Sequence, residues 1–313
     1  MTIRGRLAPS PTGAQHVGNA RTYLIAWLAA RSAGGTIALR MEDLDGPRIK
    51  KGAAEQALDD LRWLGLDWDG EPMVQSRRMA HYAAALETLK SKNLVYPCTC
   101  TRSDVAAAAS APHAGDEGPA YPGTCSRRSA TDVPTDRPYC WRFHVSDSPS
   151  FVDGFRGPVA IDLKQQGGDF VVWKTDGTPA YQLAVVVDDA AMGVTQVIRG
   201  DDLIPSTPRQ ILLYEALGLD PPTFVHVPLV VGTDGRRLAK RHGDTRLSTL
   251  RTVGVKPEML VGILAWSCGW RKEMEPATPR ELITSFDWKT IPREPFVLTE
   301  ELLAGIGFGE RPV

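Results

Sequence analysis

Hydrophobic and polar positions follow two periodicities in the first hundred residues. A short strand is expected near Ile3–Leu7, and Thr36–Met41 is a compact apolar run with one arginine, which is typical of a buried strand. By contrast, apolar residues recur every three to four positions, as they do in helices, over Gly18–Ala33, Ile49–Leu64 and Met79–Lys92. This strand–helix–strand order predicts an α/β fold with a doubly wound parallel sheet.

The pattern changes between Tyr96 and about Pro179. An Ala/Ser/Gly/Pro-rich stretch covers Ala106–Gly123, and short strand-like pieces follow at Cys140–Val145 and Phe170–Trp173. We interpret this part of the chain as a module inserted into the α/β domain.

The α/β pattern then resumes and leads into a last part rich in helical spacing. Tyr181–Val187 fits a strand or a helix, Thr195–Arg199 fits a strand, and Ser206–Leu217 opens with a proline near its first turn, as helices often do. The predicted organisation is a first α/β half over 1–95, an insert over 96–179, a second α/β half over 180–243 and a mainly helical region over 244–313.

Charge and cysteine content narrow the class of protein. The 313 residues carry 36 Lys and Arg against 37 Asp and Glu, so any surface for nucleic acid must be local. No run of eighteen apolar residues and no signal-peptide core exist, which predicts a cytosolic protein without a membrane span. Five irregularly spaced cysteines do not form a disulfide framework, and a close cluster of them predicts a metal site instead.

Two distant loops carry candidate chemistry. Before the first helix, residues 6–13 contain two prolines and a glycine, and His16 stands where the helix starts. A helix start offers N–H groups and a positive dipole end to a phosphate, and His16 can donate to phosphate oxygens. At Gly18 the missing side chain lets a nucleotide approach the backbone. In the second loop, residues 235–242, Lys240 is placed to stabilise a leaving pyrophosphate.

Taken together, the sequence blocks resemble the signature motifs of the glutamyl-tRNA synthetases, a class I aminoacyl-tRNA synthetase family. The blocks read RLAPSPTG at 6–13, HVGN at 16–19, RMEDLD at 40–45, YQLAVVVDD at 181–189, VIRGDDL at 197–203 and RLAKR at 237–241. The resemblance covers roughly 3–270 and implies a Rossmann-like domain split by a zinc-containing α+β insert that binds the acceptor, followed by a stem-contact-like region. Two positions depart from the family, Asn19 for a histidine and Ala239 for a serine.

The resemblance also implies a set of site residues. It implies catalytic roles for His16, Asn19 and Lys240, which together with Gly18 would bind ATP, a substrate used with Mg²⁺. A dicarboxylic amino acid needs separated cations and one anion, and the resemblance assigns these roles to Arg6, Arg199 and Glu42. The sequence does not decide which arginine holds the side-chain carboxylate. The remaining glutamate-binding positions that the resemblance implies are Leu7, Ala8, Pro9, Ser10 and Tyr181.

Within that family the chain is most similar to a short branch that esterifies the queuosine base in the anticodon of tRNA-Asp with glutamate. About seventy residues follow the second loop, so we expect no anticodon-binding domain. We also expect a monomer, although the sequence does not determine the oligomeric state. The partners implied are L-glutamate, ATP and queuosine-containing tRNA-Asp. Two alternatives are a truncated glutamyl-tRNA synthetase that charges a tRNA 3′ end and a catalytically idle RNA-binding paralogue.

The cysteine cluster predicts one structural Zn²⁺. Cys98, Cys100 and Cys125 supply three thiolates, and the fourth ligand is either Tyr121 or His113. The resemblance favours Tyr121, because the family uses a tyrosine four residues before its last cysteine. Cys140 and Cys268 are expected to be buried apolar residues, and Trp266 and Trp270 are expected to lie in the core. The acidic pairs at 188–189 and 201–202 are expected to be structural or to contact the nucleotide near Arg199.

Overall fold

A parallel sheet forms the centre of the molecule. The structure is a computed structural model that describes residues 2–46, 49–108, 120–238 and 245–307. Strands β1 (Arg4–Leu7), β2 (Thr36–Met41) and β3 (Met73–Val74) pair in parallel, as do β9 (Gln196–Gly200) and β10 (Thr223–Val227). The Thr195 N–H donates to the Arg4 carbonyl at 2.9 Å and joins the two sets of strands edge to edge. The predicted α/β fold is confirmed.

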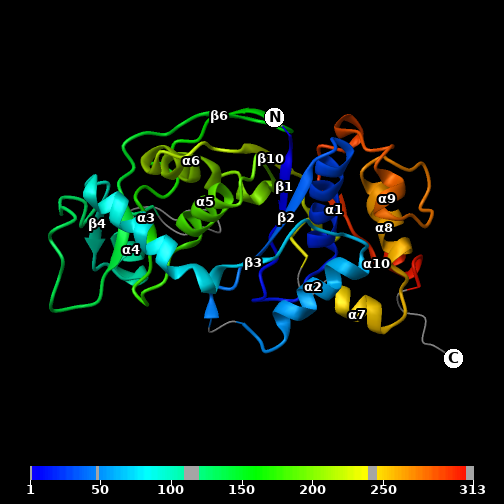
Figure 1. The fold of residues 1–313 in the computed structure, drawn as a ribbon, viewed down its shortest axis with the longest axis horizontal. Helices are drawn as coiled ribbons and strands as arrows, with labels where there is room; N and C mark the ends of the chain where they lie inside the picture. Colours follow the sequence, from blue (N-terminus) through cyan, green and yellow to red (C-terminus); the bar gives the residue numbers. More distant parts are fainter. Residues whose placement is uncertain (1, 47–48, 109–119, 239–244, 308–313) are drawn as a thin grey trace.

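Helices cover both faces of these strands. In Figure 1, α3, α5 and α6 lie to the left of β1 and β2, whereas α1, α2 and α8 lie to the right. The helices of the two α/β halves are α1 (Val17–Ser32), α2 (Ala53–Trp63), α3 (Met79–Ser91), α5 (Tyr181–Ala191) and α6 (Ser206–Leu217), with one-turn 3-10 helices η2 (Gln75–Arg78) and η3 (Asp201–Leu203).

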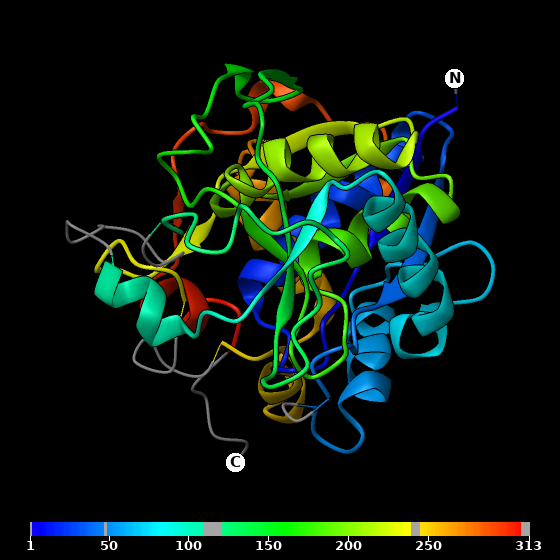
Figure 2. The ribbon, with the colours of Figure 1, turned by 90° about the vertical axis from the view of Figure 1, so that its left-hand side faces the viewer.

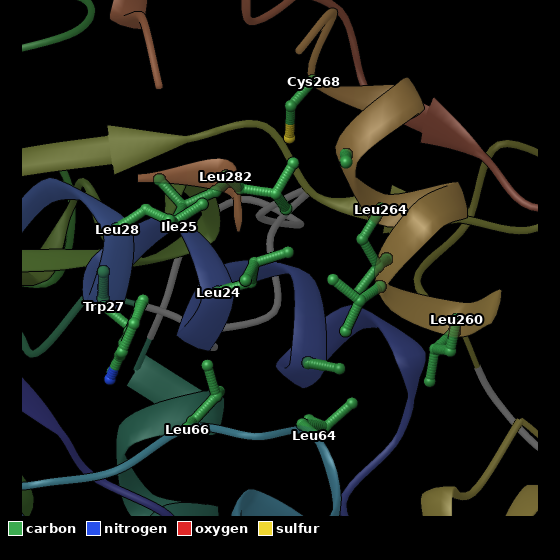
Figure 3. Packing of buried hydrophobic residues seen from close by; sticks show 14 of the residues in the cluster. Leu24, Ile25, Trp27, Leu28, Leu64, Leu66, Leu260, Leu264, Cys268 and Leu282 are labelled. Atoms are coloured by element: carbon green, nitrogen blue, oxygen red, sulfur yellow. The ribbon is translucent and has the colours of Figure 1, made fainter. Parts of the chain in front are cut away.

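Helix α1 is held by an apolar core that it shares with the C-terminal part of the chain. Leu24 and Leu28 of α1 belong to the same buried cluster as Leu260 and Leu264 of α8 and Leu282, and Figure 3 shows these residues around the space between the two helices. Each fully buried leucine contributes about 1.5–3 kcal/mol. This packing fixes the direction of α1 and therefore the place where it starts.

The inserted part contains an antiparallel sheet. Figure 2 views the molecule from this side. The sheet pairs β4 (Val95–Cys98), β5 (Cys140–Phe143) and β8 (Phe170–Trp173), and β6 (Phe151–Asp153) forms a separate hairpin with β7 (Gly157–Val159). A short helix, α4 (Arg102–Ala108), follows β4.

Some elements differ from the sequence prediction. The ambiguous segment 181–187 is part of helix α5, and α2 begins at Ala53 because Gly52 adopts a left-handed conformation with φ 79°. Trp266, expected in the core, is 36% exposed, whereas Trp270 is buried.

Prolines divide the last part of the chain into short pieces, so this region is less helical than expected. Its elements are α7 (Leu247–Thr252), α8 (Pro257–Ser267), α9 (Pro279–Leu282), η5 (Trp288–Thr290), β12 (Phe296–Val297) and α10 (Glu300–Ala304). Strand β12 pairs in parallel with β11 (Val230–Val231), a contact that the sequence did not predict. Among the described residues, no helix combines the length and apolarity that crossing a bilayer requires.

Candidate active site

A cavity of about 180 Å³ opens where strands β1, β2 and β9 end and helix α1 begins. Open α/β sheets bind ligands at the carboxyl ends of their strands, at the point where the chain turns from one side of the sheet to the other. The cavity is lined by Arg6, Ala8, His16, Gly18, Asn19, Thr22, Tyr23, Glu42, Tyr181, Ile198, Arg199, Gly200, Asp202, Leu203, Leu229, Val230, Arg237 and Leu238.

Most of the site residues expected from sequence meet at this cavity. The structure brings to its wall Arg6, Ala8, His16, Gly18, Asn19, Glu42, Tyr181 and Arg199. Leu7 and Pro9 are buried behind it, and the Ser10 hydroxyl donates to the Glu42 carbonyl at 3.3 Å. Lys240 and Ala239 lie outside the described residues, as does His113.

Arg199 is a buried cation that has no anionic partner among the described residues. It is 5% exposed, and its nitrogen atoms donate to His226 Nε2 at 3.0 Å, to Gln210 Oε1 at 2.8 Å and to Thr207 Oγ1 at 2.8 Å. Burial lowers the pKa of this guanidinium. A buried charge is costly unless it is paired, so the positive charge of Arg199 is available to an anionic ligand.

The other charged groups at the cavity compensate one another. Arg40, which is fully buried, donates to Asp189 and, at 2.9 Å, to Glu42 Oε1. Arg6 Nε lies 3.2 Å from the same Asp189 carboxylate. Because two cations face two anions, this cluster holds Arg6 and Glu42 in place at the cavity wall without excess charge.

The adjacent Asp188 is structural, as expected. Its carboxylate is fully buried and accepts hydrogen bonds from Gln75 at 2.8 Å, Arg78 at 2.7 Å and Tyr82 at 2.8 Å. This group ties α5 to η2 and α3 and does not line the cavity.

His16 and Asn19 form a capping box at the start of α1. His16 Nδ1 accepts from the Gly18 N–H at 3.1 Å and the Asn19 N–H at 3.4 Å, while Asn19 Oδ1 accepts from the His16 N–H at 3.1 Å. Burial, assisted by nearby Arg237, lowers the pKa of His16. The ring is therefore neutral at pH 7, and its proton is on Nε2, where it can be donated.

This cap corrects two expectations about the helix start. The first N–H groups were expected to be unpaired for a phosphate, but the Val17 N–H also has a partner, the Thr245 carbonyl at 3.0 Å. The helix dipole and the His16 Nε2–H remain for an anion. At Gly18, a Cβ would lie 2.9 Å from the His16 ring, so the glycine makes room for the histidine itself.

The second loop reaches the same cavity. Arg237 and Leu238 line its wall, and Arg237 forms an ion pair of 2.7 Å with Asp202 Oδ2. The Leu247 N–H donates to the Gln15 carbonyl at 2.8 Å and joins the chain beyond this loop to the one before α1. From sequence, Asp202 was expected to be structural or to contact the nucleotide, and Arg237 was one of the cations of the second loop, but their ion pair was not predicted.

The cysteine cluster has the geometry of a tetrahedral metal site. The sulfur atoms of Cys98, Cys100 and Cys125 lie within 4.8 Å of one another, and those of Cys100 and Cys125 are 3.7 Å apart. Zinc–sulfur bonds of about 2.3 Å at tetrahedral angles place two sulfurs about 3.8 Å apart. Tyr121 Oη lies 3.4 Å from the Cys98 sulfur and 3.9 Å from that of Cys100. These four atoms therefore fit a tetrahedral ion.

Hydrogen bonds around the cluster favour an anionic Cys98, whereas burial raises the pKa of the Cys100 thiol to about 11 and also raises that of the Tyr121 phenol. The Cys125 N–H donates to Tyr121 Oη at 2.8 Å, and Arg142 donates to the Cys98 sulfur at 3.3 Å. A hydrogen bond from the Cys140 thiol, with weaker help from Tyr121 and Arg142, lowers the pKa of Cys98 well below its usual range. Cys140 and Cys268 are both buried, as expected.

Comparisons with known proteins identify the family of this chain. Residues 2–304 match the family of class I tRNA synthetases (E and Q), catalytic domain. The chain is 51% identical to the glutamyl-Q tRNA(Asp) synthetase of Rhodopirellula baltica over 94% of its own length and 96% of that protein. It is also 51% identical to the enzyme of that name from Symbiobacterium thermophilum, with 97% and 98% covered.

Longer relatives and solved structures are also similar. The chain is 41% identical to the glutamate–tRNA ligase of Geobacter sulfurreducens, of which it spans 64%. A crystal structure of a glutamate tRNA ligase from Elizabethkingia meningosepticum, in complex with its amino acid, matches 98% of the chain with a TM-score of 0.82 and 28% identity. The chain therefore belongs to the class I tRNA synthetases of the glutamate and glutamine group and, within them, to the family of the glutamyl-Q tRNA(Asp) synthetases.

Proposed function

We propose that this chain is a ligase that activates L-glutamate with ATP and transfers the glutamyl group to the queuosine base in the anticodon of tRNA-Asp. The observation that carries the proposal is the buried guanidinium of Arg199, which lines the cavity without an anionic partner among the described residues. The relatives that the chain matches over nearly their whole length are named glutamyl-Q tRNA(Asp) synthetases, which supports this proposal.

The amino acid is held by charge. Arg199 binds the side-chain carboxylate, because this carboxylate stays ionised both in glutamate and in the adenylate, whereas activation neutralises the α-carboxylate. Glu42 takes the ammonium group, and Arg6 and Tyr181 border the ligand with Ala8. Glutamine is rejected because its neutral amide leaves Arg199 uncompensated.

Activation requires positioning and charge stabilisation. The α-carboxylate oxygen forms a bond to the α-phosphorus of ATP, which enters as its Mg²⁺ complex, and the bond to pyrophosphate breaks. His16 donates its Nε2–H to phosphate oxygens, Gly18 and Asn19 border the nucleotide, and Lys240 stabilises the departing pyrophosphate. A hydroxyl of the acceptor then attacks the glutamyl carbonyl and releases AMP.

Glutamate-dependent exchange of pyrophosphate into ATP tests the activation step. We expect exchange without tRNA in the native chain and a loss of about 10²–10³-fold in Lys240→Ala, comparable to removal of a group that stabilises developing charge. Lys289→Ala, an exposed lysine far along the chain, is the matched control and should exchange at the native rate. Absence of exchange in the native chain would refute the activation step and favour an idle paralogue.

The position of the attached glutamate decides between the two acceptors. We propose that the segment 96–179 and the region 244–313 contact the RNA around an unstacked anticodon base. After nuclease digestion, radiolabelled glutamate should be found on the anticodon fragment of tRNA-Asp. Label on the 3′-terminal fragment would favour the truncated glutamyl-tRNA synthetase instead.

We further propose that the cysteine cluster binds one structural Zn²⁺ with Tyr121 as its fourth ligand. When bound, the ion would crosslink β4 to the chain around Tyr121 and Cys125 and so stabilise the inserted part.

Tyr121→Phe tests this ligand set. Because it removes the phenol oxygen alone, we expect zinc affinity, measured by competition with a chromogenic chelator, to fall at least about tenfold. His113→Ala is the control and should keep the native affinity. The reverse result, with zinc lost only in the His113 variant, would assign the fourth ligand to His113.

A further inference from the structure

A buried chain of polar groups connects the inserted part of the protein to Arg199. Asp153, at the end of β6, is 2% exposed, and His226, on β10, is fully buried. Asp153 Oδ2 lies 2.6 Å from His226 Nδ1, and the other ring nitrogen, Nε2, lies 3.0 Å from Arg199 Nε. Neither Asp153 nor His226 lines the cavity.

The hydrogen-bond partners determine the protonation of His226. A guanidinium only donates, so His226 Nε2 must accept from Arg199. The Thr207 hydroxyl accepts from Arg199 Nη2 at 2.8 Å, which leaves its own proton directed at the same Nε2, 3.2 Å away. Two donors thus meet Nε2, and the single ring proton is on Nδ1, facing Asp153. Burial lowers the pKa of His226, in agreement with a neutral ring.

Asp153 is fixed in the orientation that this tautomer needs. Its Oδ1 accepts from the Phe155 N–H at 2.9 Å and the Arg156 N–H at 2.7 Å, and its Oδ2 also accepts from the His226 N–H at 3.1 Å. Three backbone donors hold the carboxylate, so it cannot rotate without leaving N–H groups unpaired in the interior.

From this geometry we propose that Asp153 and His226 are positioning residues, which hold Arg199 through a neutral acceptor and thereby link the inserted segment to the amino-acid pocket. The inference rests on the proposed function. A carboxylate in the place of His226 would cancel the charge of Arg199, whereas a neutral imidazole orients the guanidinium and leaves its charge for the ligand. Asp153 selects the tautomer that can do so.

Asp153→Asn is the first test because it changes one atom. The Phe155 and Arg156 N–H groups require an oxygen at the Oδ1 position, so the new amide N–H₂ should take the Oδ2 position, face His226 Nδ1 and move the ring proton to Nε2. Two N–H groups, those of His226 Nε2 and Arg199 Nε, would then face each other, and the hydrogen bond between them would be lost. We expect the KM for glutamate in pyrophosphate exchange to rise about 5- to 150-fold, the range for one buried donor left unpaired, with the KM for ATP within about twofold.

Nitrogen-15 NMR of the imidazole rings gives a readout independent of activity. The His226 signals are assigned by their absence in His226→Gln. In the native protein we expect the Nδ1–H tautomer, and in Asp153→Asn the Nε2–H tautomer. Asp132→Asn is the matched control, since Asp132 also accepts from a backbone N–H in the insert, that of Ser129, but is exposed, and it should change neither readout.

Two replacements of His226 separate positioning from packing. His226→Gln and His226→Leu both lose the imidazole and its bond to Asp153, but only glutamine offers Arg199 an acceptor. We expect glutamine to keep the KM for glutamate within about threefold of native and leucine to raise it by the factor expected for Asp153→Asn. Equal KM values in these two variants would overturn the proposal.

The NMR test does not depend on whether His226→Leu folds, because it compares only Asp153→Asn with the native protein. An Nε2–H tautomer in the native protein would also overturn the proposal. If the native chain shows no pyrophosphate exchange at all, the proposed function fails. The Nδ1–H tautomer in the native protein and the Nε2–H tautomer in Asp153→Asn would still support the positioning role of Asp153 and His226.

Discussion

Replacing Arg199 with methionine is expected to lower kcat/KM for glutamate in pyrophosphate exchange by at least about 100-fold. Methionine fills a similar volume but removes the charge that the side-chain carboxylate of glutamate would meet. Breaking a buried ion pair by removing one partner costs about 3–5 kcal/mol, and each 1.36 kcal/mol changes a rate constant tenfold. Steady-state exchange at varied glutamate measures the effect.

Arg209→Met is the matched control for this variant. Arg209, which lies in α6, is buried like Arg199, but its guanidinium donates to the Gln166 carbonyl at 2.5 Å and does not line the cavity. We expect it to keep kcat/KM for glutamate within about threefold of the native value. Similar losses in both variants would show that Arg199 acts through the fold and not on the ligand.

Asp189→Asn is expected to lower the free energy of unfolding by about 3–5 kcal/mol. Asp189 faces the buried guanidiniums of Arg40 and Arg6, and a neutral amide leaves both without their shared counter-charge. The whole stability of a native protein is only about 5–15 kcal/mol, so this change is large. Urea denaturation with linear extrapolation measures it.

An exposed ion pair provides the control for Asp189. Asp59 pairs with Arg62 at 3.1 Å on the surface of α2, and Asp59→Asn should change the free energy of unfolding by less than about 0.5 kcal/mol. In addition, a double-mutant cycle of Asp189→Asn and Arg40→Met should show that their effects on the free energy of unfolding are not additive, because residues 40 and 189 contact each other. Independent effects of the two substitutions would contradict the network.

Hydrophobic periodicity was sufficient to predict the α/β fold. The segments predicted as strands at 3–7 and 36–41 are β1 and β2 within one residue, and the apolar run at 36–41 reflects burial on both faces of a parallel sheet. The segment 181–187 was ambiguous because a short apolar run suits a buried helix as well as a strand. Strand β12 was missed, since two residues give no periodic signal.

The candidate site was predictable where a motif fixes a residue type. The blocks at 6–13, 16–19, 40–45 and 197–203 gave the residues that the fold brings to one cavity. The hydrogen bonds that orient them were not predictable. Asp153 and His226 are separated by 73 residues, and only the contact between β6 of the insert and β10 brings them together. Likewise, the capping role of His16 depends on backbone geometry that a spacing pattern does not contain.

A crystal structure with a non-hydrolysable analogue of glutamyl-adenylate tests the central claim most directly. We predict that the side-chain carboxylate of the analogue lies within hydrogen-bond distance of the Arg199 guanidinium, with its ammonium group at Glu42 and its phosphate at His16. A carboxylate bound elsewhere, with Arg199 still bonded only to neutral groups, would contradict the account.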